Sequence, residues 1–228
     1  MRRRTRLRDR VLPDYTRGEE ITNTVTHIVG GAFGIVVLVL CVVFAALRKD
    51  PYRIIGASIY GASLVFLYTM SSVYHGLRTG TGKKVLQVLD HCTIYFLIGG
   101  TYTPVLFGPI HDSRPALSWI IFGIVWGVSC LAVVFTAIDH NKYAALSMIC
   151  YLCIGWVIVF FSSDTIESVG LSGFLWLLAG GIAYSIGALF YMLGGKMHMR
   201  YMHSVFHCFV LLGSILQFVA VFVYCILH

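Results

Sequence analysis

The sequence predicts an all-α membrane protein, a seven-transmembrane helix bundle. Of the 228 residues, 58% are apolar and only 12% are charged. A soluble domain of this length has too much surface for its volume to bury that share of apolar side chains, whereas lipid can cover them. The second observation is a series of continuous apolar runs, each of about the 20 residues that a helix needs to cross the hydrocarbon core.

The runs follow one another along the whole chain after the first 27 residues. They are Ile28–Leu47, Ile54–Leu77, Val85–Phe107, Ala116–Ile138, Tyr143–Ser163, Leu171–Leu193 and Tyr201–Leu227. Because each run is continuously apolar and not alternating, helices are favoured over barrel strands. The polar connections are short, so consecutive helices are expected to be antiparallel neighbours. We therefore divide the chain into a basic arm, residues 1–27, and one transmembrane domain, residues 28–228.

Lys and Arg are unevenly distributed among the connections. With the N-terminus inside, 13 fall inside (seven of them arginines before Gly18) and 4 outside, which together make the 17 of the composition. The positive-inside rule then predicts a cytoplasmic N-terminus and an external C-terminus. The first connection, with Arg48, Lys49 and Arg53, opposes this trend. The arginine-rich arm could bind nucleic acid, but a topogenic flank lying against anionic lipid is favoured, and no nucleic-acid partner is expected.

Small residues inside the runs predict close packing. Gly30 and Gly34 form a G-x-x-x-G motif, which more often marks packing within a bundle than a dimer face.

The polar connections between the runs are expected from Gly108 to Pro115 and from Asp164 to Gly170, among others. The seven cysteines are interpreted as buried small apolar side chains and not as a disulfide framework.

Ionisable residues inside the runs gather at one predicted side, although the orientation was derived from the connections alone. His75 lies near the end of the second run, Asp90 and His91 near the start of the third, and His203 and His207 near the start of the seventh. Glu19, Glu20 and His27 flank the start of the first run on the same side. Each such group needs a partner or a function. His203 and His207 are four residues apart and share a helix face, so they could hold one metal ion. The alternative is a pair of interface histidines bonded to backbone.

The third histidine, His75, favours the metal interpretation. Three imidazoles with one open position are typical of catalytic zinc, although imidazole also suits Cu, Fe and Ni. Ser71 shares a helix face with His75, and Asp90 could hold a metal-bound water or act as a general base. The alternatives are a Ser71 hydroxyl bonded to the carbonyl four residues earlier and an Asp90 carboxylate favoured by the helix dipole. The remaining charged or histidine positions of the connections are expected to be solvated; they include His111, His140, His198, His228, Asp112, Asp139, Asp164 and Glu167.

Four motifs carry a family resemblance that covers nearly the whole chain. They are E-x-x-N-x-x-T-H (Glu20 to His27), S-S-V-Y-H (Ser71 to His75), L-D-H-C-T-I-Y-F-L-I-G-G-T-Y-T-P (Leu89 to Pro104) and H-S-V-F-H (His203 to His207). The chain resembles the hemolysin III branch of the progestin and adiponectin receptor superfamily.

The resemblance implies zinc bound by His75, His203 and His207, with Asp90 contacting the metal through water. It also implies ceramidase-like hydrolysis, a membrane-lytic label for the bacterial branch, and a location in the bacterial inner membrane. Gln217 stands where many relatives carry a histidine, so no ligand is expected there.

Three functions follow, and the sequence leaves open whether the protein is an enzyme. The first is a zinc-dependent intramembrane hydrolase of a lipid amide or ester, with Asp90 as base and Ser71 as hydrogen-bond donor. The second is a non-enzymatic receptor or regulator of membrane state with structural zinc. The third is a lytic pore, but no charge ring or polar stripe runs through the spans. Membrane lipids, with a ceramide-like amide as possible substrate, are the expected partners; the sequence carries no signal for an oligomeric state.

Overall fold

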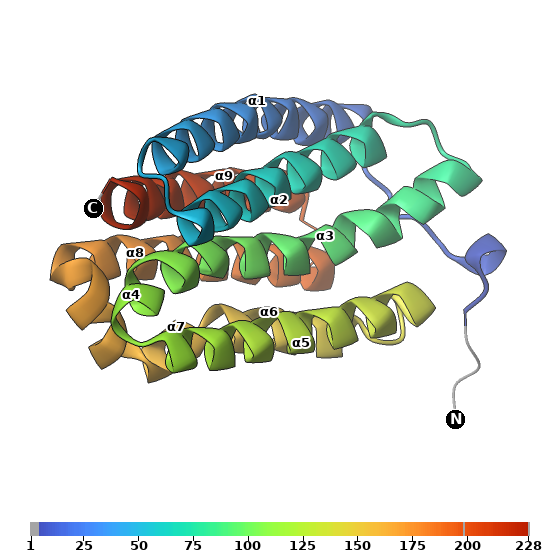
Figure 1. Ribbon diagram of the computed structural model, residues 1–228. Coiled ribbons are helices and arrows are strands. Elements are labelled where there is room, and N and C mark those ends of the chain that lie inside the picture. The colour runs from blue at the N-terminus through green and yellow to red at the C-terminus, as the bar shows by residue number, and fades with distance from the viewer. Residues whose placement is uncertain (1–4, 198, 228) are drawn as a thin grey trace.

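The computed structural model describes residues 5–197 and 199–227, which form a bundle of long helices (Figure 1). The long helices are α1 (Arg17–Leu47), α2 (Pro51–Gly76), α3 (Thr81–Val105), α5 (Pro115–Asp139), α8 (Ser162–Met197) and α9 (Met202–Val221). The short elements are η1 (Leu7–Asp9), η2 (Leu106–Ile110), α4 (His111–Ser113), α6 (Ala144–Gly155), α7 (Val157–Phe160) and η3 (Phe222–Ile226). The part of the chain that the structure describes contains no strand, which confirms the predicted all-α class.

Within residues 5–197 and 199–227, six helical segments are long and apolar enough to cross a membrane, and the apolar helix Ala144–Phe160 is shorter. Many large apolar side chains point outward, among them Leu131 and Phe160, of which Phe160 is 85% exposed. An apolar outer surface of this kind suits lipid and not water. The chain is therefore a multi-pass membrane protein, whereas the seven-span count and the orientation of the termini stay predictions.

The first helix begins eleven residues before the first apolar run. Thr16 and Glu19 form a capping box, in which Thr16 Oγ1 accepts from Glu19 N at 3.2 Å and Glu19 Oε2 accepts from Thr16 N at 2.8 Å. Because the helix starts at Arg17, the polar residues of the second half of the predicted arm lie on α1, among them Glu20, Asn23 and His27.

Two predicted connections are helical instead. Residues 106–110 form a π-helical turn with non-helical backbone at Gly108, and α4 follows directly. The segment from Asp164 to Gly170 lies inside α8, which bends at Gly170 with a φ of +73°. The prediction of a polar connection there is wrong, because Arg114 pairs with both Asp164 and Glu167 and allows these acidic residues to lie on a helix.

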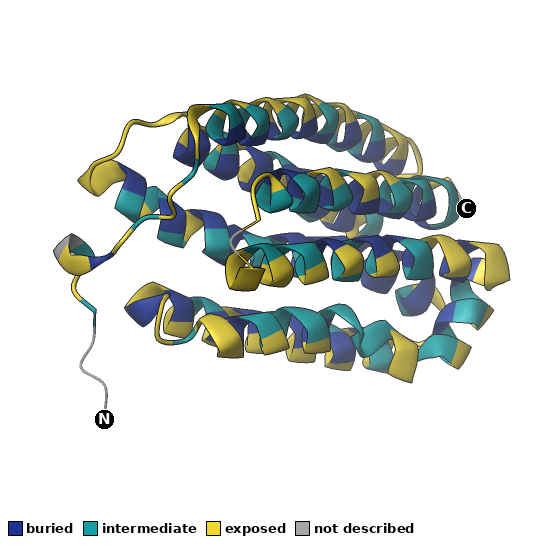
Figure 2. Cartoon of the chain, turned by 180° about the vertical axis from the view of Figure 1, so that it is seen from behind, coloured by how far each residue is buried: buried dark blue, intermediate teal, exposed yellow. Residues whose placement is uncertain are grey.

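The third helix occupies the centre of the bundle. In the most apolar 18-residue stretch of the helical segment Thr81–Ser113, 83% of the residues are buried. The corresponding share is 28% in α1 and 28% in α5. One apolar cluster surrounds α3, including Tyr95, Tyr102 and Val125, and a second lies between α1, α2 and α9. The buried faces of the helices turn toward one another, and the exposed faces turn outward (Figure 2).

Glycines allow close approach at two helix pairs. On α1, a Cβ at Gly30 would collide with the Tyr68 ring of α2, and Gly34 lies against the backbone of the same helix. The predicted packing of this motif within the bundle is confirmed. On α8, glycines recur every seventh residue and receive side chains; they are Gly173, Gly180, Gly187 and Gly194. This seam fixes α9, which carries two of the candidate ligands.

The arm crosses one end of the bundle, which we call the arm end (Figure 1). Thr5 N donates to Asp139 Oδ2 at 2.7 Å, and Arg10 is buried. His140 and Asp139 are buried too, so the prediction that these two are solvated is wrong: the arm and the ring of His91 cover them. His198 and His228 lie outside the described residues, as do Arg2, Arg3 and Arg4.

All seven cysteines are free, as predicted, but three of them are exposed on the outer surface and not buried; these are Cys130, Cys153 and Cys208. Thiols are weakly polar, and lipid accepts them without a partner.

Candidate metal site

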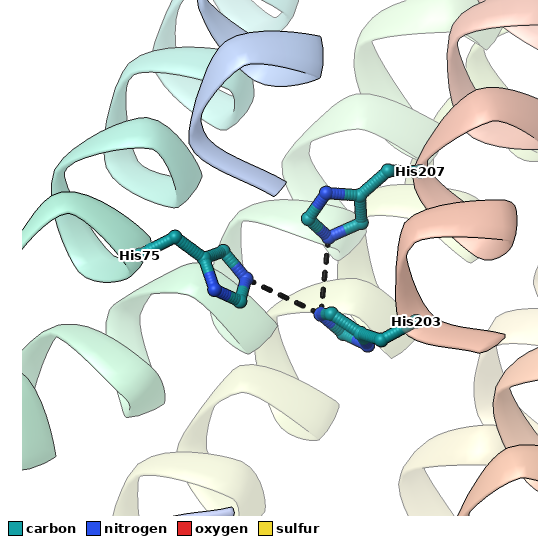
Figure 3. Close-up of side chains that lie close together, drawn as sticks. All are labelled: His75, His203 and His207. Carbon is teal, nitrogen blue, oxygen red and sulfur yellow. Dashed lines mark hydrogen bonds between the residues drawn. The ribbon is translucent and has the colours of Figure 1, made fainter. Parts of the chain in front are cut away.

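Three histidines from two helices bring their rings together at the arm end (Figure 3). His75 ends α2, and His203 and His207 lie in the first two turns of α9. His203 Nε2 lies 3.3 Å from His75 Nε2 and 3.0 Å from His207 Nε2. One nitrogen of each ring lies within 4.8 Å of a nitrogen of the other two, close enough for the three to bind one metal ion.

These separations fit zinc. With zinc–nitrogen bonds of about 2.0–2.1 Å, two ligands of a tetrahedral site are about 3.3 Å apart. The cluster is also buried: His75 and His207 are 2% and 1% exposed. A ring nitrogen either donates one hydrogen bond or accepts one, so His203 Nε2 cannot form hydrogen bonds to both neighbouring rings. One cation can satisfy all three nitrogens.

A carboxylate of α1 contacts the His75 ring at the nitrogen that faces away from the other two histidines. Glu20 Oε2 lies 2.7 Å from His75 Nδ1. The imidazole therefore donates from Nδ1, which leaves Nε2 as an acceptor directed at the other two rings. A carboxylate behind a histidine is a common arrangement around zinc, since it fixes the tautomer and strengthens the ligand.

Two further rings enclose the cluster. His27 of α1 stacks on His207 with ring centroids 3.7 Å apart, and neither of its nitrogens has a hydrogen-bond partner among the described residues. From the arm, Tyr15 stacks on His203 at 5.1 Å and tilts over His75 at 5.7 Å. Burial raises the pKa of Tyr15, so its phenol stays neutral. The two rings limit how far the imidazoles can turn.

The predicted Ser71 and Asp90 lie beside the cluster. Both line the same cavity as His203 and His207. Ser71 is 1% exposed, and its Oγ has no hydrogen-bond partner among the described residues. The alternative of a hydroxyl bonded to the carbonyl four residues earlier is therefore excluded. Asp90 lies in the third turn of α3, and its Oδ2 is 4.0 Å from His91 Nδ1.

The cavity runs from the cluster toward the middle of the bundle. It has a volume of about 150 Å³ and a mostly apolar lining, and its far end is reached by Tyr102, Trp156 and Gln217. His203 and Gln217 are fourteen residues apart on α9, which corresponds to about 21 Å along the helix axis. Gln217 donates to the carbonyl of Leu177 at 3.0 Å, far from the three imidazoles, as expected for a residue that is not a ligand. A mostly apolar cavity with the candidate metal ligands at one end suits an amphipathic molecule.

Sequence reasoning placed Glu20 and His27 at the same end of the bundle as the three histidines, but it gave them no part in the site. Glu20, Asn23 and His27 recur at positions i, i+3 and i+7, the spacing of one helix face, and this signal was present in the motif. Asn23 Oδ1 accepts from Ser204 Oγ at 2.6 Å and links α1 to α9. Tyr15 and Lys83 carry no such pattern, since their contacts depend on how the arm and the second connection fold back.

Comparison with known proteins identifies relatives over nearly the whole chain. The chain matches the family described as "Haemolysin-III related" over residues 15–218. It is 34% identical over 212 residues to "Hemolysin-3 homolog" of Bacillus subtilis (strain 168), covering 93% of this chain and 97% of that one. It is 32% identical to "Hemolysin-3" of Bacillus cereus, covering 90% and 91%. Identity to the human "Monocyte to macrophage differentiation factor" is 27%, over 90% and 84%.

Proposed function

The chain belongs to the haemolysin-III-related family, and from this premise we propose that it is a zinc-dependent membrane hydrolase of a lipid amide or ester. One observation carries the proposal. Three imidazole nitrogens converge at the end of an apolar cavity that is also lined by a buried carboxylate, Asp90, and a buried hydroxyl, Ser71. These residues would supply a metal-binding set, a base and a hydrogen-bond donor beside space for a lipid chain.

His75, His203 and His207 would hold the zinc. When bound, zinc lowers the pKa of water toward about 7 and polarises a carbonyl group. Asp90 accepts the proton from the attacking water and delivers it to the leaving amine or alkoxide. Ser71 donates its hydroxyl hydrogen to the oxygen on which negative charge develops, a role for which its unpartnered Oγ is suited.

The cavity favours a substrate with a long acyl chain, such as a ceramide-like amide. Its lining is apolar away from the cluster, so an acyl chain can lie along α9 while the amide or ester group lies near Asp90. Chain burial supplies binding energy, and the polar end fixes the position of the reacting carbonyl.

The proposed setting is the inner leaflet of a bacterial plasma membrane, with the N-terminus in the cytoplasm. The excess of Lys and Arg on the predicted inner connections supports the orientation. The two Bacillus relatives support the bacterial membrane.

The test combines metal content with turnover. Purified protein in detergent is expected to contain about one zinc per chain and to release fatty acid from a ceramide-like amide. His203→Ala should lose both the zinc and the turnover, because it removes the nitrogen that lies between the other two. His111→Ala at the other end of the bundle is the matched control and should keep both. Wild-type protein without zinc by elemental analysis would overturn the proposal.

A regulator with structural zinc is the second candidate. It is favoured by one observation, that the candidate ligands join α2 to α9 and a metal there would staple the two helices. In that case Asp90→Asn would leave both zinc and biological activity unchanged. The names of the two Bacillus relatives suggest lysis, but the cavity has a mostly apolar lining, which is unsuitable for a conducting pore.

A further inference from the structure

A buried lysine lies close to the three imidazoles. Lys83 belongs to the first turn of α3 and is 5% exposed. A cation in the first turn of a helix is disfavoured by the helix dipole, and a buried ammonium loses most of its hydration. This position therefore raises the free energy of the folded protein unless the contacts of the ammonium group compensate.

The ammonium group has three hydrogens, and the structure gives each an acceptor. Lys83 Nζ donates to Glu20 Oε1 at 2.6 Å, to the carbonyl of Leu77 at 2.9 Å and to the carbonyl of His75 at 3.3 Å. It also lies 5.3 Å from the centre of the Tyr74 ring. Two of the three hydrogen bonds converge on the end of α2 that carries His75, and the bond to Glu20 pairs the cation with a carboxylate.

Glu20 connects the lysine to the candidate ligand. One carboxylate oxygen accepts from Lys83, and the other lies 2.7 Å from His75 Nδ1. The chain Lys83–Glu20–His75 thus passes from α3 through α1 to α2 and ends at the imidazole whose Nε2 faces His203. The side chain of Glu20 is 22% exposed, so water can reach the carboxylate. Hydrogen bonds to mobile water would not hold one particular oxygen against His75, whereas the hydrogen bond from Lys83 does.

We propose that Lys83 is a positioning residue for the metal site, because it holds the Glu20 carboxylate in the orientation in which His75 presents Nε2 to the metal. The inference rests on the proposed zinc site. A carboxylate paired with an ammonium group accepts the Nδ1 hydrogen in a fixed geometry, and this fixes both the tautomer and the ring plane of the ligand. The hydrogen bond from the same lysine to the carbonyl of His75 fixes the place of the ammonium group beside Glu20.

The test measures zinc affinity by competition with a chromophoric chelator in detergent. Lys83→Met should weaken zinc binding by about 10-fold, and Glu20→Gln by about 10–100-fold, the range for residues behind a zinc ligand. Arg78→Met is the matched control, since Arg78 is an exposed cation of the same connection, and it should leave the affinity unchanged. Cobalt(II) in place of zinc gives a visible spectrum that reports ligand geometry, and it should change in Lys83→Met and not in the control.

A double variant separates positioning from a general structural role. The side-chain amide that Glu20→Gln introduces is neutral and needs no counter-ion, so adding Lys83→Met to that variant should cost no further zinc affinity. The second substitution also removes the unpaired buried cation that could prevent the single Glu20→Gln variant from folding.

Unchanged zinc affinity and cobalt spectrum in Lys83→Met would overturn the inference while the zinc site itself survives. An equal additional loss in the double variant would also overturn it, because the lysine would then act without Glu20. Failure of the proposed function gives a different result, namely wild-type protein that binds no zinc.

Discussion

The two ends of the bundle use charged residues in different ways. At the opposite end from the arm, Arg53 pairs with Asp50 and Asp112, and Arg114 pairs with Asp164 and Glu167. Several of these side chains are well exposed: Asp112 is 51% and Glu167 63%. At the arm end, Lys83, His75 and His207 are buried. The three imidazoles face one another, and Lys83 is joined to them through Glu20.

The pKa of Asp50 illustrates the first kind of pairing. Partial burial alone would raise it, but hydrogen bonds from Arg53 and from the backbone of α2 hold it below its usual value. Such pairs join the ends of helices and contribute little free energy in water. Burying the same groups is costly, so the burial at the arm end indicates a ligand or a reaction. The following substitutions test this difference, beginning with the largest effect.

Asp90→Asn at the arm end should lower the turnover of a ceramide-like amide by about 10²–10⁴-fold, because a neutral amide cannot accept the proton. Zinc content should stay near one per chain, since Asp90 is not among the three candidate ligands. Asp112→Asn, the equivalent change at the other end, should leave turnover unchanged. Equal rates for the wild type and Asp90→Asn would remove Asp90 from the reaction.

Asn23→Leu should destabilise the metal-free protein by about 1–3 kcal/mol, because the buried hydroxyl of Ser204 loses its acceptor. Its counterpart is Ser113→Ala, which removes an exposed contact to Ser168 and should change the free energy of unfolding by less than about 0.5 kcal/mol. Denaturant titration in detergent with a chelator present measures both. Similar values for the two variants would contradict the contrast between the ends.

His140 gives the arm end a dependence on pH. Burial lowers the pKa of His140 to about 3, and His91 and Arg10 act in the same direction, against Asp139. In the unfolded chain this pKa is about 6.5, so above that pH both states are neutral and the stability is complete. As pH falls, only the unfolded state takes up the proton, and stability declines toward pH 3.

The loss from this one residue should reach about 1.4 kcal/mol at pH 5.5. His140→Gln should flatten the acid side of the stability profile by that amount, measured by denaturant titration from pH 7.5 to 5.5. Profiles with the same slope would show that His140 is hydrated in the folded protein.

Arg114→Met should have the smallest effect, below about 1 kcal/mol, because its two ion pairs are exposed and screened by salt. The difference from wild type should shrink further as salt is raised to about 1 M. A loss as large as that of Asn23→Leu would show that the ion pairs at this end also contribute strongly.

The fold was predictable where apolar length determines it. Lipid requires each crossing to be a helix, so composition and run length were enough for the all-α class and for the positions of α2, α5 and α9. The start of α1 at Arg17 and the helix around Asp164 were missed, because hydropathy ignores a capping box and an ion pair formed by a distant arginine.

The site was predictable where candidate ligands share a helix. His203 and His207 are four residues apart, and His75 was expected at a similar depth, so the sequence placed all three at one level of the bundle. The family resemblance then implied that they form one ligand set. The contacts of Tyr15, Lys83 and His140 depend on how the arm and the connections fold over the bundle, and no periodicity records that. Asp139 and His140 were expected in water for the same reason.

The place of Tyr15 has a practical consequence. Its ring closes the imidazole cluster by stacking, and it belongs to the arm that crosses the arm end. An affinity tag or fluorescent fusion joined to the arm would disturb the segment that covers the site, and a polyhistidine tag there would also compete for the ion. Protein prepared for metal analysis should carry its tag at the other terminus, which lies at the far end of the bundle (Figure 1).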